Sequence, residues 1–199
     1  MFNRFVWQYV FAFIFIVYVL VSYSAYDELM ANIIRFVGFC CVIVGVIGRL
    51  YATIFIGGMK NEGTDGTHFI DYGAYSLCRN PLYFFSFIAF IGLVALKAQL
   101  SLIIIAVIFY LWVYHYTIKG EENFLRSKFG SKYEEFLAKT SRFFPKFKDF
   151  YVPYEIKMRP EFFHKELMRS INWFLGAFAL LLVEILHQGE FLPNLLKVY

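Results

Sequence analysis

The stretch "PLYFFSFIAFIGLVALKAQLSLIIIAVIFYLWVYHYTI", residues 81–118, decides the fold because it holds two apolar runs joined by a very short link. The runs are residues 81–96 and 100–118, and the link is residues 97–99. So short a link permits only a tight helical hairpin, in which two antiparallel helices are neighbours. We therefore expect the residues before the first helix and those after the second to lie side by side at one membrane depth.

The composition excludes an ordinary soluble domain. Hydrophobic residues make up 60% of the chain and aromatic residues 22%, with 26 Phe and 15 Tyr. A globular protein of 23.5 kDa has no core large enough to hide so much apolar surface, so lipid must cover much of it. A membrane-spanning helix needs about 20 mostly apolar residues. We predict a single all-α, multi-pass membrane domain over residues 1–199, with about five spans near residues 5–23, 34–57, 81–96, 100–118 and 170–187.

The basic residues predict the orientation, since Lys and Arg concentrate on the cytoplasmic side of inner-type membranes. Twelve of the nineteen Lys and Arg fall in the polar segment 119–170. We expect this segment, the loop 58–80 and the amino terminus to be cytoplasmic, and the loops 24–32 and 97–99 and the carboxyl tail to lie outside. The sequence pI of about 8.9 then reflects attraction to anionic membrane lipids, and we expect no nucleic-acid partner.

The cytoplasmic segment predicts two short amphipathic helices that Gly130 separates, since glycine commonly follows a helix end. Ser131 and Glu134 have the spacing of a capping box. The apolar face of the second helix is expected to pack against the membrane or the loop 58–80, and consists of Tyr133, Phe136 and Leu137. Pro160 is predicted to open the helix that leads into the fifth span. The glycine-rich loop around His68 lacks P-loop spacing and is a candidate lid.

The residues just before the hairpin, Arg79, Asn80 and Pro81, have two interpretations. In the structural one, Asn80 caps the helix, Pro81 forms its first turn and Arg79 anchors it at the membrane face. In the functional one, the helix N-terminus and the Arg79 guanidinium bind a carboxylate. Glu121 and Glu122 stand opposite across the hairpin, so such a pocket suits a zwitterionic ligand.

Three further polar features also have structural alternatives. The paired acids favour the dipole of a helix's first turn, and Glu122 is four residues before Arg126. Arg49 lies inside the second span, where it either snorkels to the interface or faces the site. Glu184 and His187 could ligate a metal, but we interpret them as an interfacial helix end, and no Cys/His spacing predicts a zinc site.

The segments "YGAYSLCRNPLYF" and "EENFLRSKFGSKYEEF" together resemble the isoprenylcysteine carboxyl methyltransferase family, which belongs with the phospholipid methyltransferases in one membrane-embedded superfamily. The family pattern is Gly-x-Tyr, Arg-His-Pro-x-Tyr, Glu-Glu and Phe-Gly-x-x-Tyr. The matching residues are Gly73, Tyr75, Arg79, Pro81, Tyr83, Glu121, Glu122, Phe129, Gly130 and Tyr133. The match covers about residues 52–144, and Asn80 departs from the family's histidine, which puts a mechanism that needs imidazole there in doubt.

The resemblance implies a methyltransferase that takes S-adenosylmethionine as its donor. Arg79 and the helix start at Pro81 are then expected to hold the donor carboxylate, and Arg79 and Glu122 are the implied catalytic residues. Glu121 or Glu122 would bind the ammonium group or the ribose hydroxyls. The remaining implied cofactor-binding residues are Gly73 for close backbone approach, Tyr75 and Tyr83 for ring contact with the sulfonium, and Asn80.

The resemblance also implies a lipophilic acceptor, which is a prenylated-cysteine carboxylate, a phospholipid amine or a small lipophilic metabolite. A carboxylate is already ionised near pH 7, whereas an amine must first lose a proton. The candidate bases, His115 and Glu122, are weak ones, so the carboxylate is slightly favoured. The alternative from another class is a non-catalytic membrane scaffold or transporter, which Asn80 and the absence of an unambiguous base would suit.

Overall fold

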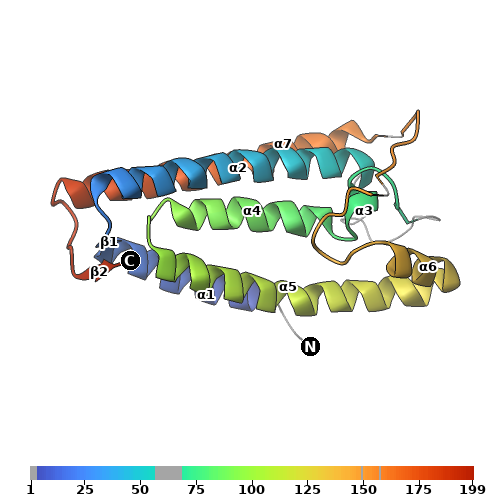
Figure 1. Cartoon of the computed structure of the whole chain (residues 1–199), viewed down its shortest axis with the longest axis horizontal. Coiled ribbons are helices and arrows are strands. Elements are labelled where there is room, and N and C mark those ends of the chain that lie inside the picture. The colour runs from blue at the N-terminus through green and yellow to red at the C-terminus, as the bar shows by residue number, and fades with distance from the viewer. Residues whose placement is uncertain (1–3, 57–68, 149, 157) are drawn as a thin grey trace. The chain divides into compact units, whose positions relative to one another are not determined.

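A computed structural model describes residues 4–56, 69–148, 150–156 and 158–199 of the chain. Its elements, labelled in Figure 1, are α1 (Arg4–Val21), β1 (Ser22–Ser24), α2 (Glu28–Ile56), α3 (Ala74–Leu77), α4 (Pro81–Ala95), α5 (Leu100–Phe129), α6 (Ser131–Lys139), α7 (Pro160–Gln188) and β2 (Leu196–Val198). The described part is therefore all-α apart from one short pair of strands, which confirms the predicted fold class. The candidate lid around His68 lies outside the described residues.

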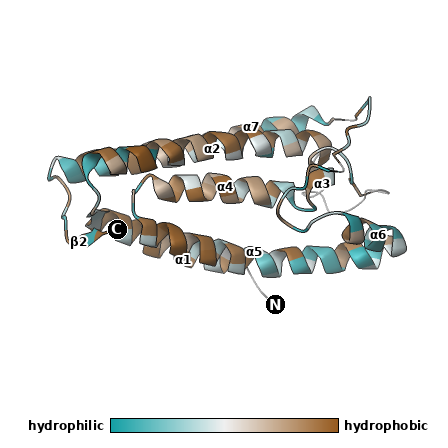
Figure 2. Ribbon diagram, viewed as in Figure 1, coloured by the Kyte–Doolittle hydropathy of each residue, from teal (hydrophilic) through white to brown (hydrophobic). Residues whose placement is uncertain are grey.

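Several helices have the length and composition of membrane spans. Within the described residues, α2, α5 and α7 are each long and apolar enough to cross a membrane, and two shorter apolar helices cover Val6–Val21 and Pro81–Ala95. Figure 2 shows apolar residues along α1, α2 and α4, and polar residues along α6 and the carboxyl-terminal part of α5. These features define a membrane protein, and the number of five spans stays a prediction.

Helix α5 is longer than the predicted fourth span. No residue after position 118 breaks the helix, so the first predicted amphipathic helix is simply its continuation to Phe129. Gly130 then separates α5 from α6, as predicted, and has a φ of 55°. The predicted capping box was wrong: Gly130 itself is the N-cap of α6, and no side chain caps that helix. Glu134 instead pairs with Arg126, at 3.0 Å between Oε1 and Nε.

Two of the long helices also begin before the predicted spans. The Met30 N–H donates a hydrogen bond to Asp27 Oδ1 at 3.0 Å, so Asp27 caps α2 and this helix begins at Glu28. Helix α7 begins at Pro160, as predicted, because proline suits the first turn of a helix. The predicted fifth span is thus the apolar second half of a longer helix.

The chain forms two compact units, and the expected single membrane domain stays a prediction. The first unit consists of Met1–Ile43, Ile88–Thr117 and Asn172–Tyr199. In it, a Cβ atom on Gly38 of α2 would lie 2.7 Å from the Gly92 carbonyl oxygen of α4, and one on Gly92 would lie 2.5 Å from the Gly38 oxygen. The two helices approach so closely that both positions require glycine.

The carboxyl tail of the first unit returns to the loops between helices. β1 pairs in parallel with β2, with Ser22 opposite Leu196 (Figure 1). The Ser101 N–H donates to the Tyr199 carbonyl oxygen at 2.9 Å, and the Ser24 hydroxyl donates to the Ala98 carbonyl oxygen at 2.7 Å. The loop after α1, the link between α4 and α5 and the tail therefore meet, which agrees with the predicted topology that places all three on one membrane face.

The second unit consists of Val44–Phe87 and Ile118–Ile171. In this unit α6 lies beside the end of α5 (Figure 1). Phe69 packs between them, with ring centroids 5.4 Å from Phe129, 5.5 Å from Tyr133 and 5.3 Å from Phe136. The apolar face of α6 thus packs against the end of the loop 58–80, one of the two surfaces expected from the sequence.

Arg49 joins three helices of the second unit, a role that neither sequence interpretation described. Its Nε and Nη2 atoms donate to Glu166 Oε1 of α7 at 2.8 and 2.5 Å. Its Nη1 atom donates to Ser86 Oγ of α4 and, at 3.3 Å, to the carbonyl oxygen of Leu82. These partners offset the cost of placing a charge inside an apolar helix, so the guanidinium need not reach the interface.

Candidate functional site

The start of α4 and the polar part of α5 meet in the second unit, as the hairpin predicted. Arg79, which precedes α4, places Nη1 3.0 Å from Glu122 Oε1 of α5. Tyr83, in the first turn of α4, donates a hydrogen bond from its hydroxyl to Glu121 Oε1. Each acid of the pair therefore contacts a different residue of the family pattern, and both contacts bridge the two helices.

Arg142 completes this cluster, although the sequence marked it only as one basic residue among many. Its Nη2 atom lies 3.2 Å from Glu122 Oε2, so Glu122 lies between two guanidinium groups. Two hydrogen bonds hold the chain around Arg142 in place: Arg79 N–H donates to the Ser141 carbonyl oxygen at 2.9 Å, and Asn80 Nδ2 donates to the Arg142 carbonyl oxygen at 3.0 Å. No spacing rule links residues so far apart, and no signal in the sequence pointed to Arg142.

The structural alternative for the paired acids included a contact between Glu122 and Arg126, and in the structure these two residues have other partners. Arg126 binds Glu134 of α6, and both of these side chains are about half exposed. Glu122, by contrast, is only 8% exposed and lies beside the partly buried guanidinium groups of Arg79 and Arg142. The buried partners are preferred because a carboxylate that leaves water needs compensating charge.

Four buried polar atoms of this cluster make no hydrogen bond to any described residue: Tyr75 Oη, Arg79 Nε, Glu122 Oε1 and Arg142 Nε. The contact between Arg79 and Glu122 is thus a charge contact without an aligned hydrogen bond. Buried polar atoms are normally paired, so a group of four with spare capacity is notable. Two guanidinium donors, a carboxylate acceptor and a phenol can bind a ligand that carries both a carboxylate and an ammonium group, and the residues present therefore fit S-adenosylmethionine.

Burial raises the pKa of three side chains near the cluster, Tyr75, Cys78 and Tyr133, and so keeps them protonated. Burial raises the pKa of Tyr133 to about 12, and Glu122 adds to this rise while Arg79 opposes it. Burial also raises the pKa of Tyr75 well above its ordinary value. For Cys78, burial raises the pKa to about 12, so its reactive thiolate is scarce at neutral pH. These side chains can donate hydrogen bonds but are poor proton acceptors.

The other residues expected at the site have clear structural roles. Asn80 and Pro81 are buried, and Pro81 is the first residue of α4. Gly73 has φ 61° and ψ −133°, and a Cβ atom there would lie 2.3 Å from the Phe55 ring. Packing against Phe55 therefore explains the glycine, and its role in ligand approach stays a prediction. His115, a candidate base, is exposed on α5.

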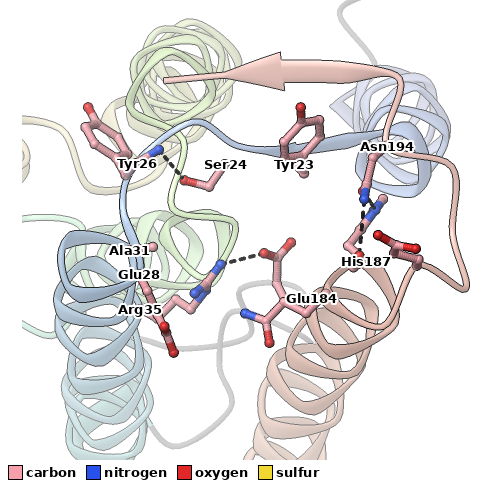
Figure 3. Close-up of a pocket in the computed structure, with 11 residues that line it drawn as sticks. Tyr23, Ser24, Tyr26, Glu28, Ala31, Arg35, Glu184, His187 and Asn194 are labelled. Atoms are coloured by element: carbon pink, nitrogen blue, oxygen red, sulfur yellow. Dashed lines mark hydrogen bonds and ion pairs between the residues drawn. The ribbon is translucent and has the colours of Figure 1, made fainter.

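The first unit holds a second buried polar cluster, beside a cavity of about 540 Å³ (Figure 3). Glu184 Oε2 lies 2.6 Å from Arg35 Nη2, and Glu184 Oε1 pairs with the fully buried Lys97. His187 Nδ1 is 2.7 Å from Asn194 Oδ1. Among the described residues, no three His, Cys, Asp or Glu side chains gather in a way that could hold a metal ion. The sequence had assigned Lys97 only to a turn.

The structure thus places two arginines and the buried Glu122 together beside a helical hairpin of an all-α membrane protein. The chain belongs to the phospholipid methyltransferase family, whose model matches residues 29–132, just over half of the 199 residues. Members of this family use S-adenosylmethionine as methyl donor. The match includes the site residues from Gly73 to Glu122, whereas Arg142 lies beyond it.

Two curated proteins are similar to the chain over most of its length. The nickel-cobalt-cadmium resistance protein NccN of Alcaligenes xylosoxydans xylosoxydans is 28% identical over 159 residues, which cover 79% of this chain and 71% of that protein. The cobalt-zinc-cadmium resistance protein CzcN of Cupriavidus metallidurans is 27% identical over 172 residues, which cover 86% of this chain and 76% of that protein.

Proposed function

We propose that the protein transfers a methyl group from S-adenosylmethionine to a lipophilic acceptor at the cytoplasmic face of a membrane. The observation that carries this proposal is the cluster of Arg79, Glu122 and Arg142, which gathers both charges that the donor's amino-acid end requires. The unpaired atoms of these three side chains provide the hydrogen-bonding capacity that such a ligand would use. Membership of the phospholipid methyltransferase family supports the same chemistry.

Each residue of the cluster has an assigned role in this proposal. S-adenosylmethionine supplies a methyl group activated by its sulfonium. Arg79 and Arg142 hold a carboxylate, since guanidinium groups match its planar geometry, and Glu122 holds an ammonium. The remaining contacts are assigned to Tyr75 and Tyr83 for the sulfonium and to Glu121 for the ribose hydroxyls. We assign Asn80 and Pro81 to positioning, because Asn80 Nδ2 already binds the Arg142 carbonyl oxygen.

We favour a carboxylate acceptor, because the described residues of the site include no strong proton acceptor. Glu122 is engaged by two guanidinium groups, and Glu121 accepts a hydrogen bond from Tyr83. Burial holds the protons on Tyr75 and Tyr133. A carboxylate is already ionised near neutral pH, so catalysis can rest on alignment and on the exclusion of water. The description of the family favours the second candidate, a phospholipid amine.

The acceptor can be identified with methyl-labelled donor and membranes that contain the protein. A carboxylate acceptor yields a methyl ester, which alkali hydrolyses, whereas an N-methylated phospholipid keeps its label in alkali. We expect alkali-labile label with the wild type and with Arg126→Ala, and none with Arg79→Ala. Alkali-stable label in a phospholipid would establish the second candidate, and labelling by Arg79→Ala equal to the wild type would contradict the assigned site.

The names of the two relatives suggest a physiological setting for this activity. We propose that methylation by this protein contributes to resistance to divalent metals such as cobalt and cadmium. A strain that lacks the protein should grow less well in cobalt or cadmium than one complemented with the wild type. Complementation with Arg79→Ala should fail if methyl transfer is what protects; full rescue by that variant would dissociate the resistance from the methylation.

A further inference from the structure

Residues 141–148 and 150–154, which we call the aromatic strap, lie between α6 and α7 in the second unit and expose unusually many aromatic rings. Phe144 is 64% exposed, Phe147 76% and Tyr154 101%, and the other exposed aromatic side chains are Phe150 and Tyr151. Large contiguous apolar surface on a protein marks a binding surface for protein or membrane. The strap therefore needs a partner outside the described part of the chain.

The strap is fixed at its beginning rather than loose on the surface. Phe143 packs on α4, with its ring centroid 5.7 Å from that of Phe84 and 5.8 Å from that of Phe87. The next residue, Phe144, lies with its ring 6.3 Å from Phe84 and remains exposed on its other side. One ring thus anchors the strap while the following rings face outward.

The strap also hydrogen-bonds along the segment that carries the candidate site, residues 73–80. Lys146 N–H donates to the Leu77 carbonyl oxygen at 2.9 Å, and Gly73 N–H donates to the Tyr151 carbonyl oxygen at 2.7 Å. The other bonds between the two segments are Arg79 N–H to the Ser141 carbonyl oxygen, Tyr151 N–H to Ser76 Oγ, Ser141 Oγ to the Leu77 carbonyl oxygen, and Asn80 Nδ2 to the Arg142 carbonyl oxygen. The position of the strap and the position of residues 73–80 are therefore coupled.

The charges of the strap indicate what covers its rings. Over residues 141–154 the sequence holds three basic residues, Arg142, Lys146 and Lys148, and one acidic residue, Asp149. Lys146 and Lys148 are exposed and alternate with the exposed Phe147. Tyrosine rings, here those of Tyr151 and Tyr154, favour the membrane–water interface, and lysines beside it are attracted to anionic headgroups. This combination, in a chain with membrane-spanning helices, fits the surface of an anionic bilayer.

We propose that the aromatic strap docks on the anionic phospholipid headgroups of the surrounding bilayer, and that this docking holds residues 73–80 in the arrangement that presents Arg79 and Tyr75 to the site. Anionic lipid is thus a regulator of the site and not only the solvent of the helices. The inference concerns the order of the backbone and is tested without methyl transfer, so its failure would leave the proposed function standing.

Hydrogen exchange of the protein in lipid nanodiscs tests this coupling directly. Nanodiscs of pure phosphatidylcholine are compared with nanodiscs in which about one third of the lipid is phosphatidylglycerol. We expect the amides of residues 73–80 and 141–154 to exchange roughly three- to tenfold more slowly in the anionic nanodiscs, because docking suppresses local opening. The variant Lys146→Gln/Lys148→Gln should lose this slowing.

The matched control is Lys132→Gln/Lys197→Gln, which removes the same charge from exposed side chains outside the strap. In this control variant the same amides should exchange more slowly in the anionic nanodiscs, as they do in the wild type. Equal exchange of the wild type in both nanodiscs would overturn the proposal. The proposal would also be overturned if the control variant lost this slowing as fully as Lys146→Gln/Lys148→Gln does. The total charge of the protein, and not the strap, would then be responsible.

Discussion

The Glu122 carboxylate carries the contacts on which the candidate site depends. Its side chain is 11% exposed, that of Arg79 is 14% exposed, and the two lie 3.0 Å apart. Removing one partner of such a buried pair costs about 3–5 kcal/mol, because the other charge stays buried without compensation. A loss of function in a variant of Arg79 or Glu122 is therefore interpretable only when the variant is shown to fold.

Gly73 and Gly120 provide the sharpest prediction at single-residue scale. Gly73→Ala should lower the free energy of unfolding by at least about 2 kcal/mol, because φ 61° is strained for alanine and Cβ would meet the Phe55 ring. Gly120→Ala should raise it by about 0.5–1 kcal/mol, since a Cβ atom in α5 there meets nothing within 4 Å. Reversible unfolding in detergent measures both, and equal effects would contradict the packing described around Gly73.

The sequence predicted where some residues of the site lie, but not all of them. Arg79, Tyr83, Glu121 and Glu122 could be brought together from the short link alone, because it fixes which helix ends are neighbours. Arg142 could not, since its place depends on how the chain after α6 hydrogen-bonds to residues 79 and 80. A contact between distant segments that no periodic pattern connects is visible only in three dimensions.

Among the elements, α2, α4 and α7 of the second unit are joined by the Arg49–Glu166 pair. Arg49→Met should lower the free energy of unfolding by about 3–5 kcal/mol, because among the described residues Glu166 then keeps only the cation of Arg169, at 3.8 Å. Arg49→Met/Glu166→Met should be more stable than either single variant, since no buried charge is left alone. Removing the exposed pair Glu161–Lys165 should leave the free energy of unfolding nearly unchanged, because water screens its charges. Strictly additive losses for Arg49 and Glu166 would count against a coupled pair.

Lys97, in the link between α4 and α5, predicts a pH dependence. Burial lowers its pKa below the ordinary value of 10.5, and the hydrogen bond that Lys97 donates to Glu184 opposes this only in part. Between the lowered pKa and 10.5 the unfolded chain therefore holds the Lys97 proton more often than the folded chain does. The free energy of unfolding contributed by Lys97 must then rise with pH in this window.

Comparison of the wild type with Lys97→Met isolates this contribution. As the pH rises toward 10.5, the wild type should gain stability relative to the variant, measured as the difference between their free energies of unfolding. A difference that falls with rising pH would show that the folded protein raises, and does not lower, the pKa of this lysine.

At the scale of the whole molecule, the topology is the main prediction. The tail and the loops near residues 24 and 98 meet in the first unit, so they must share one membrane face. The basic segment 119–170 is expected on the cytoplasmic face. Reporters fused after Tyr199 and inserted at residue 148 should therefore report opposite faces, outside and inside respectively, and reports from the same face would contradict the assigned topology.

The sequence predicted much of the fold, because the length of each apolar run and the length of each link between runs can be read from the local sequence. The helices, their order and the hairpin follow from them, as does the break at Gly130. Three features were not predicted: the continuation of α5 to Phe129, the early start of α2 at its Asp27 cap, and the β1–β2 pair. At each of these places the local sequence is compatible with more than one structure. Tertiary contacts, such as those of β2, determine which structure forms.

The central claim is that Arg79 and Glu122 form one binding site for the methyl donor, and calorimetry with S-adenosylhomocysteine, the demethylated donor, tests it most directly. We expect the purified wild type and Arg126→Ala to bind this product alike, and Arg79→Ala and Glu122→Ala to bind it more than tenfold more weakly, at least about 1.4 kcal/mol. Circular dichroism of each variant must show it folded. Binding that Arg79→Ala leaves unchanged, or no binding by a folded wild type, would contradict the account, and the latter would favour a non-catalytic scaffold or transporter.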